Sequence, residues 1–186
     1  MRGFLNRLRP KFVRRFIKSD SGATAVEFSL VALPFFTILG CICETGLMLF
    51  TQYAIQTGVQ EASRQIRTGQ AQAAGLSAAA FKTKICATTG LVVDCAGGLT
   101  VYVRPATTFG ALKTAVPSYL NVGPTDPASY NCGTASQPVA VIATYDWAFT
   151  MPFMNFLGNI SGGTKRRIYG IAVFQNEPFI AITTCT

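Results

Sequence analysis

Apolar residues fill the segment from Phe28 to about Phe50, and Glu44 is the only charged residue within it. A membrane-crossing helix needs roughly 20 mostly apolar residues, so this segment predicts one crossing. Pro34 lies inside the segment and lacks the amide hydrogen that a helix uses, so we expect a kink there.

Helical periodicity continues beyond the apolar segment and ends at Gly69, a residue type that tolerates the left-handed conformation of helix ends. An apolar stripe with spacings of four, three and four consists of Ile55, Val59, Ala62 and Ile66. The opposite, polar face carries Gln52, Gln56, Gln60, Glu61, Arg64 and Gln65. One helix of roughly 40 residues is therefore predicted to start in the membrane and project from it.

Farther along, Ser77 is placed as the N-cap of a short helix that ends near Cys86, with Leu76 and Phe81 as a hydrophobic staple. The hydrophobic period then changes from helical to alternating, which is typical of strands. Three such strands are predicted at 99–104, 139–149 and 168–174. Frequent prolines confine the stretch between the first two strands to loops and a short helix at 111–114. The fold class is thus α+β, with a small antiparallel sheet packed on helix.

Basic residues are concentrated before Gly22, where seven Lys and Arg face a single acid, Asp20. The positive-inside rule predicts a cytoplasmic leader (1–22), a membrane-spanning and projecting helix (23–69) and an exported domain (70–186). In the leader, apolar residues recur every four positions at Phe4, Leu8, Phe12 and Phe16. That face either lies on anionic lipid headgroups or belongs to an ordinary charged leader that only sets topology. No nucleic-acid partner is expected.

Composition narrows the possible functions. With 49% hydrophobic and 13% charged residues, disorder is excluded as the main state of the chain. The absence of histidine excludes Ser-His and Cys-His nucleophile pairs and every zinc site that contains histidine. The acids Asp94, Asp126, Asp146 and Glu177 are scattered and form no spaced pair. We therefore expect neither an enzyme nor a cofactor. The basic cluster Lys165-Arg166-Arg167 is expected at a solvated strand edge, or against an acidic partner or lipid.

The six cysteines form two groups. Cys41 and Cys43 lie in the apolar segment and are expected to pack as small apolar residues. The other four follow it on the side where disulfides persist, and we favour the pairs Cys86–Cys95 and Cys132–Cys185. In the chain-entropy model these bonds contribute about 2.7 and about 4 kcal/mol. A zinc site would need close Cys-x-x-Cys pairs, which the sequence lacks, so no metal is expected.

Where leader and apolar segment meet, the chain contains Ser21-Gly22-Ala23-Thr24-Ala25-Val26-Glu27-Phe28. A glycine, small residues and then Glu-Phe, between a basic leader and an apolar helix, resembles a prepilin-peptidase site. The stretch from Gly22 to about Gly69 resembles the TadE-like family, pilin-like minor components of the tight-adherence (Flp-type) pilus apparatus. The tail Val173-Phe174-Gln175-Asn176-Glu177-Pro178-Phe179 also resembles that family.

The resemblance implies a pseudopilin of the bacterial inner membrane that is cleaved after Gly22. Its implied partners are a prepilin peptidase, the major Flp-type pilin, a sister minor pseudopilin, inner-membrane platform proteins and membrane lipid. Cleavage leaves Ala23 as a new amine one helical turn before Glu27, and that carboxylate is implied to pair with the amine on its own or a neighbouring subunit. Glu44 is expected either to pair with a cation of a neighbouring subunit or to reach the lipid headgroups.

Two alternatives remain open from the sequence. The chain is an uncleaved, membrane-anchored accessory or sensor protein, or it is an exported binding module acylated at Cys41. Ile38-Leu39-Gly40-Cys41 resembles a lipobox, although Leu39 stands where a small residue is usual and the leader is long. The identity of the mature N-terminus separates these alternatives.

Overall fold

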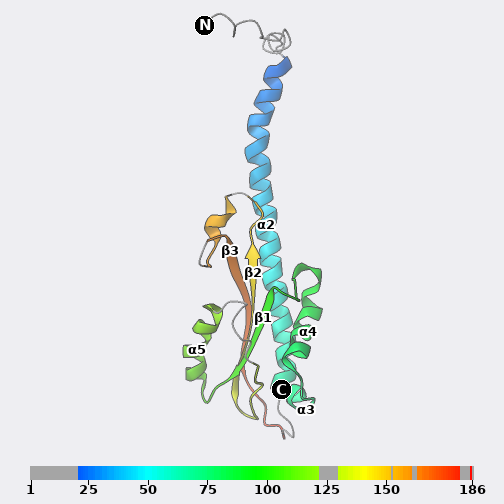
Figure 1. Cartoon of the computed structure of the whole chain (residues 1–186), viewed down its shortest axis with the longest axis vertical. Coiled ribbons are helices and arrows are strands. Elements are labelled where there is room, and N and C mark those ends of the chain that lie inside the picture. Colours follow the sequence, from blue (N-terminus) through cyan, green and yellow to red (C-terminus); the bar gives the residue numbers. More distant parts are fainter. Residues whose placement is uncertain (1–20, 122–129, 152, 161–162, 181–184, 186) are drawn as a thin grey trace, which may run out of the picture. The chain divides into compact units, whose positions relative to one another are not determined.

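The computed structural model describes residues 21–121, 130–151, 153–160, 163–180 and 185 (Figure 1). Its elements in chain order are α2 (Ser21–Arg67), α3 (Gln70–Ala73), α4 (Ala78–Thr89), η1 (Gly90–Val92), β1 (Leu99–Pro105), α5 (Phe109–Asn121), β2 (Pro138–Ala148), η2 (Met154–Leu157) and β3 (Lys165–Gln175). The predicted leader helix face (residues 4–16) lies outside the described residues. The predicted α+β class is confirmed: a long apolar helix precedes a small domain with a three-stranded antiparallel sheet.

Internal contacts divide the chain into two compact units, Met1–Cys43 and Glu44–Thr186, so the division falls inside α2. Residues 22–43 form the described helical part of the first unit, and nearly all of their large apolar side chains are exposed. In the second unit Glu44 and Met48 are already buried. The second unit therefore begins inside the apolar segment from Phe28 to Phe50, at Glu44.

The second unit is built on a meander sheet in the order β1-β2-β3. Leu99 to Pro105 of β1 pair with Tyr145 to Val139 of β2, and Pro138 to Ala148 of β2 pair with Gln175 to Lys165 of β3. One sheet face packs against the stripe of α2 and against Phe81 and Ile85 of α4. All four residues of the α2 stripe, Ile55, Val59, Ala62 and Ile66, are buried, as the periodicity predicts.

Both ends of the helical region follow their local sequence signals. Gly69 has a φ of 79°, the left-handed conformation expected just after the end of α2 at Arg67. Ser77 caps α4, because its Oγ accepts a hydrogen bond from the amide of Ala80 at 3.3 Å. That helix runs to Thr89, three residues beyond the expected end near Cys86.

One expectation for the middle of the chain is wrong in its extent. The helix predicted at 111–114 is α5, which has 13 residues and continues through Pro117. On the second face of the sheet, Thr100, Tyr102 and Ile142 are buried as well. The reason is that α5 packs on β2 over that face, with Leu112 buried. The sheet is thus covered on both sides, by α2 and α4 on one and by α5 on the other.

Candidate functional site

The candidate cleavage motif occupies the first turns of α2, which begins at Ser21. Ala23, Glu27 and Phe28 are exposed, and Gly22 is half-exposed. Residues four apart share a helix face, so an amine at Ala23 would lie one turn from the Glu27 carboxylate. The bond after Gly22 lies in the first turn, where amides lack intrahelical partners and the helix frays most easily. The bond after Gly22 is therefore surrounded by small side chains and by backbone at the end of a helix.

Pro34 lies inside α2, and the chain remains helical on both sides of it. The hydroxyl of Thr37 donates a hydrogen bond to the carbonyl of Leu33 at 2.8 Å, a local bond that is common in apolar helices. The kink at Pro34 stays a prediction.

Glu44 is the first residue of the second unit and is 7% exposed. Its carboxylate accepts hydrogen bonds from two consecutive backbone amides just after β2, those of Thr150 and Met151, the latter at 3.0 Å. Two amides that satisfy a buried charge explain why a carboxylate is tolerated among apolar side chains. Neither expectation for Glu44, a neighbouring subunit or lipid headgroups, includes this partner within the same chain.

Gln56 holds α2 to the edge strand β3. Its side-chain Nε2 donates to the carbonyl of Ile171 at 2.9 Å, and its Oε1 accepts from the amide of the same residue at 2.9 Å. Gly170 permits this approach, because a Cβ atom there would lie 2.9 Å from the Cα of Gln56. The sequence pattern placed Gln56 on a polar face. In the structure its side-chain amide binds the backbone of the edge strand β3 at one residue, in the way that a neighbouring strand would.

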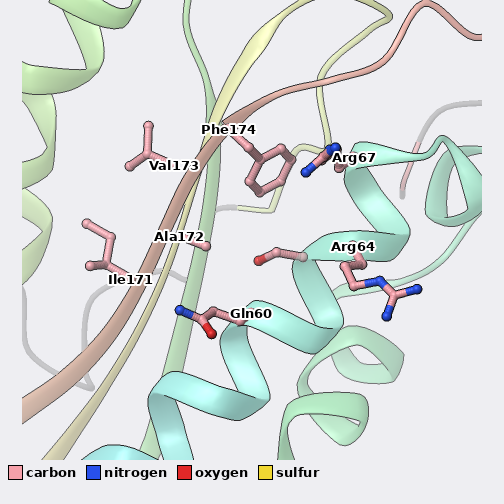
Figure 2. Close-up of a pocket in the computed structure, with 8 residues that line it drawn as sticks. Gln60, Arg64, Arg67, Ile171, Ala172, Val173 and Phe174 are labelled. Carbon is pink, nitrogen blue, oxygen red and sulfur yellow. The ribbon is translucent and has the colours of Figure 1, made fainter.

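A shallow groove of about 300 Å³ lies between the end of α2 and β3 (Figure 2). Its lining residues are Gln60, Ser63, Arg64, Arg67, Ile171, Ala172, Val173 and Phe174. Arg64 pairs with Glu61 at 3.6 Å, and Arg67 pairs with Glu177 at 3.3 Å. These ion pairs are exposed and contribute little to stability.

The C-terminal tail closes the end of α2. The amide of Glu177 donates to the carbonyl of Arg67 at 2.9 Å, which satisfies a terminal carbonyl of the helix. Asn176 is buried, and its side-chain Nδ2 donates to the carbonyls of Cys132 and Thr134 at 3.0 and 2.9 Å. The tail that resembles the TadE-like family therefore has a structural role in this chain.

The structure contains both disulfides that the sequence favours, Cys86–Cys95 and Cys132–Cys185. The first joins α4 to the loop before β1, and the second holds the C-terminal segment beside the loop before β2. Cys41 and Cys43 form no disulfide. Within the described ranges, no group of three or more acids and cysteines is placed to hold a metal ion.

The acids considered for catalysis take part in structural contacts. Asp146 and Arg167 form a bidentate ion pair between β2 and β3, at 2.6 and 2.8 Å. Asp94 accepts from the amide of Ala96 at 3.1 Å in a turn. Glu177 pairs with Arg67, and Asp126 lies outside the described residues. Of the basic cluster, Arg167 is thus paired inside the sheet rather than left at a solvated edge, and Lys165 is exposed.

These features define a class: among the described residues, one helix is long and apolar enough for single-pass membrane anchoring, and the second half of that helix is built into a small disulfide-bonded α+β domain. The family model for TadE-like protein matches residues 22–64, and this segment is accordingly TadE-like. TadE-like proteins are structural components of pilus systems, so the match points to a part of a Tad pilus system. The match includes Gly22, Glu27, Glu44 and Gln56 and stops before the sheet. No curated protein and no solved structure matches the chain.

Proposed function

We propose that this chain is a minor pilin-like subunit of a tight-adherence pilus machine, cleaved after Gly22 and assembled through the first half of α2. The observation that carries this proposal is the coincidence of the TadE-like match with an apolar helix whose large hydrophobic side chains are mostly exposed. Residues 22–43 comprise 22 residues, about 33 Å of helix, which spans a bilayer's hydrocarbon core. Such a helix needs lipid or neighbouring helices around it.

In this proposal the leader (residues 1–22) stays in the cytoplasm, the helix crosses the inner membrane and the disulfide-bonded domain faces the periplasm. The basic leader supports that orientation, and two disulfides suit an oxidising compartment. In the proposal, the predicted boundary at 69–70 separates the helix (23–69), which takes part in assembly, from the exported domain (70–186). The second half of α2 packs with that domain.

After cleavage, the new amine of Ala23 and the Glu27 carboxylate lie on one exposed helix face. An ion pair between these groups in neighbouring subunits would align one helix with the next, because an unpaired carboxylate in lipid is costly. The proposed partners are a prepilin peptidase, the major Flp-type pilin, a sister minor pseudopilin and inner-membrane platform proteins.

The experiment is to produce the full chain with and without a cognate prepilin peptidase, and to determine its intact mass and N-terminal sequence under non-reducing conditions. We expect a chain that begins at Ala23 only when the peptidase is present, lighter by the hydrogens of two disulfides. Gly22→Leu should abolish cleavage by blocking approach to the backbone. Gly40→Leu, in the same helix, is the matched control and should be cleaved like the wild type.

Two results would contradict the proposal. A chain that still begins at Met1 in cells with active peptidase would identify an uncleaved anchor or sensor. A chain that begins at an acylated Cys41, and that Gly40→Leu abolishes, would identify a lipid-anchored module.

A further inference from the structure

Phe153, which immediately precedes η2, and Phe156, which lies within it, are exposed to solvent on the folded domain. Phe153 is 80% exposed and Phe156 is 79% exposed, although both belong to the compact second unit. Phe153 also has a φ of 68°, a backbone conformation that costs free energy for a residue other than glycine. Such a conformation persists only where its surroundings hold it.

The segment around these rings is firmly held. Met154 is buried between the two phenylalanines in sequence. Arg166 of β3 donates to the carbonyl of Leu157 at 3.1 Å, just after Phe156. Asn159 bonds the backbone of β3 at Arg167, accepting from its amide at 2.7 Å. The backbone that carries the two exposed rings is therefore held by hydrogen bonds to β3. Contact with water does not explain why the fold holds two apolar rings in exposed positions.

The carboxylate of Glu44 links this turn to the beginning of the second unit. Its carboxylate binds the amides of Thr150 and Met151, two residues before Phe153. Glu44 itself follows Cys43, the last residue of the first unit, by a single peptide bond. The turn is therefore bonded to the first residue of the second unit.

Near the turn, three basic residues (Lys165, Arg166 and Arg167) outnumber the two acids Asp146 and Glu44. Lys165 is exposed and pairs in register with Ala148, the last residue of β2. Arg166 follows it, and the nearby Asp146 is neutralised by Arg167. Leu47 and Phe50 of α2, within two turns of Glu44, are also exposed. Apolar rings with flanking cations suit the interface of a bilayer that contains anionic lipid.

We propose that Phe153 and Phe156 insert into the outer interface of the membrane that α2 crosses, so that the turn at η2 seats the exported domain on anionic phospholipid. Figure 1 shows η2 beyond the tip of the β2 arrow, at the opposite end of the sheet from α3. The Glu44 contact is the link that sets the height of this turn at the membrane surface. The inference rests on the membrane crossing and orientation of the proposed function but requires neither cleavage nor a pilus, so the N-terminal analysis above and the quenching test below can fail independently.

The test uses the full chain in vesicles of phosphatidylethanolamine and phosphatidylglycerol with brominated acyl chains, which quench tryptophan fluorescence at short range. The sole tryptophan is first removed by Trp147→Phe, and Phe153→Trp is then introduced. Phe36→Trp in the apolar segment is the positive control. Phe109→Trp at the start of α5 is the matched surface control, because it is exposed and lies at the other end of β2.

We expect Phe153→Trp to be quenched at least threefold more than Phe109→Trp and within about twofold of Phe36→Trp. Equal quenching at 153 and 109, with Phe36→Trp strongly quenched, would overturn the inference while membrane anchoring stands. That result would leave the two rings for a protein partner. Absence of quenching at all three positions would remove the inserted helix and overturn the inference with it.

A second measurement needs no substitution. Hydroxyl-radical labelling of the wild-type chain in the same vesicles without bromine compares Phe153 and Phe156 with Phe109. Phe109 is less exposed than either in the structure, so free rings would label in the order 153 and 156 above 109. Insertion reverses this order, with at least threefold less labelling at 153 and 156. The unreversed order would overturn the proposal.

Discussion

The two halves of α2 use similar apolar residues in opposite ways. In the first half Ile38 is 61% exposed, whereas in the second half Ile55 is fully buried. Both belong to one continuous helix, and nothing in the residue type separates them. In the part of the chain that the structure describes, the large apolar side chains of the first half are mostly uncovered, whereas the second half packs on its own sheet. A hydrophobic residue is therefore informative here only together with what covers it.

The acids of the same helix repeat the comparison. Glu27 is exposed in the first unit, and Glu44 is buried and bonded to two amides in the second. Glu27 is free to act between subunits, whereas Glu44 already has a structural role. The difference agrees with the proposal that the first half serves assembly, and it shows that Glu44 in the second half binds the domain.

The largest expected effect is on the free energy of unfolding of the domain, and it compares a buried with an exposed isoleucine of α2. Ile55→Ala should lower the free energy of unfolding of the domain by about 3 kcal/mol, because it leaves a cavity under the sheet. Ile38→Ala removes the same atoms from an exposed position and should leave domain unfolding unchanged. Urea unfolding of the full chain in detergent micelles, followed by near-UV circular dichroism, measures both. Equal losses would show that the first half is also packed, and the comparison would fail.

A smaller effect is expected at the two acids. Glu44→Gln should destabilise the domain by about 2 kcal/mol, since a charged acceptor of two buried amides is replaced by a neutral group. Glu27→Gln should unfold like the wild type, and its effect should appear only in assembly with partner subunits. The same urea titration measures stability. If Glu44→Gln unfolds at wild-type urea concentration, the carboxylate does not hold the turn before η2.

The smallest expected effect is on the pH dependence of stability, and it tests how far the second unit shields Tyr130 from water. Burial raises the pKa of Tyr130 to about 12, above the ordinary value of 10. Because folding favours the protonated phenol, its contribution is complete below pH 10 and is lost as pH rises from 10 through 12. Tyr130→Phe should therefore lose less stability than the wild type between pH 9 and 11, by less than about 1 kcal/mol after solvent screening.

Thermal unfolding under non-reducing conditions at both pH values measures this difference. Tyr169→Phe is the matched control, because it removes the same hydroxyl from a ring that is exposed on β3. An identical alkaline loss in Tyr130→Phe would mean that its phenol is not shielded by the fold.

Local signals in the sequence determined the elements that depend on neighbours along the chain. The stripe from Ile55 to Ile66 predicts the buried face of α2, Gly69 its end, and Ser77 the start of α4, because periodicity and capping act within a few residues. The three strands follow from alternation, and both favoured disulfides are present. The TadE-like segment is recognisable for the same reason, as a motif of contiguous residues.

Only the tertiary structure decided the contacts between distant residues. Glu44 meets Thr150 across 106 positions and Gln56 meets Ile171 across 115, and a polar side chain does not encode its partner. The helix α5 continues past the proline that the sequence pattern treats as a breaker, because it is held against the second face of the sheet. That packing also buries Tyr102 and Ile142. The alternating pattern alone does not predict which element covers these two residues. Local chemistry thus set the elements, and long-range packing decided which side chains remain available for membrane and partners.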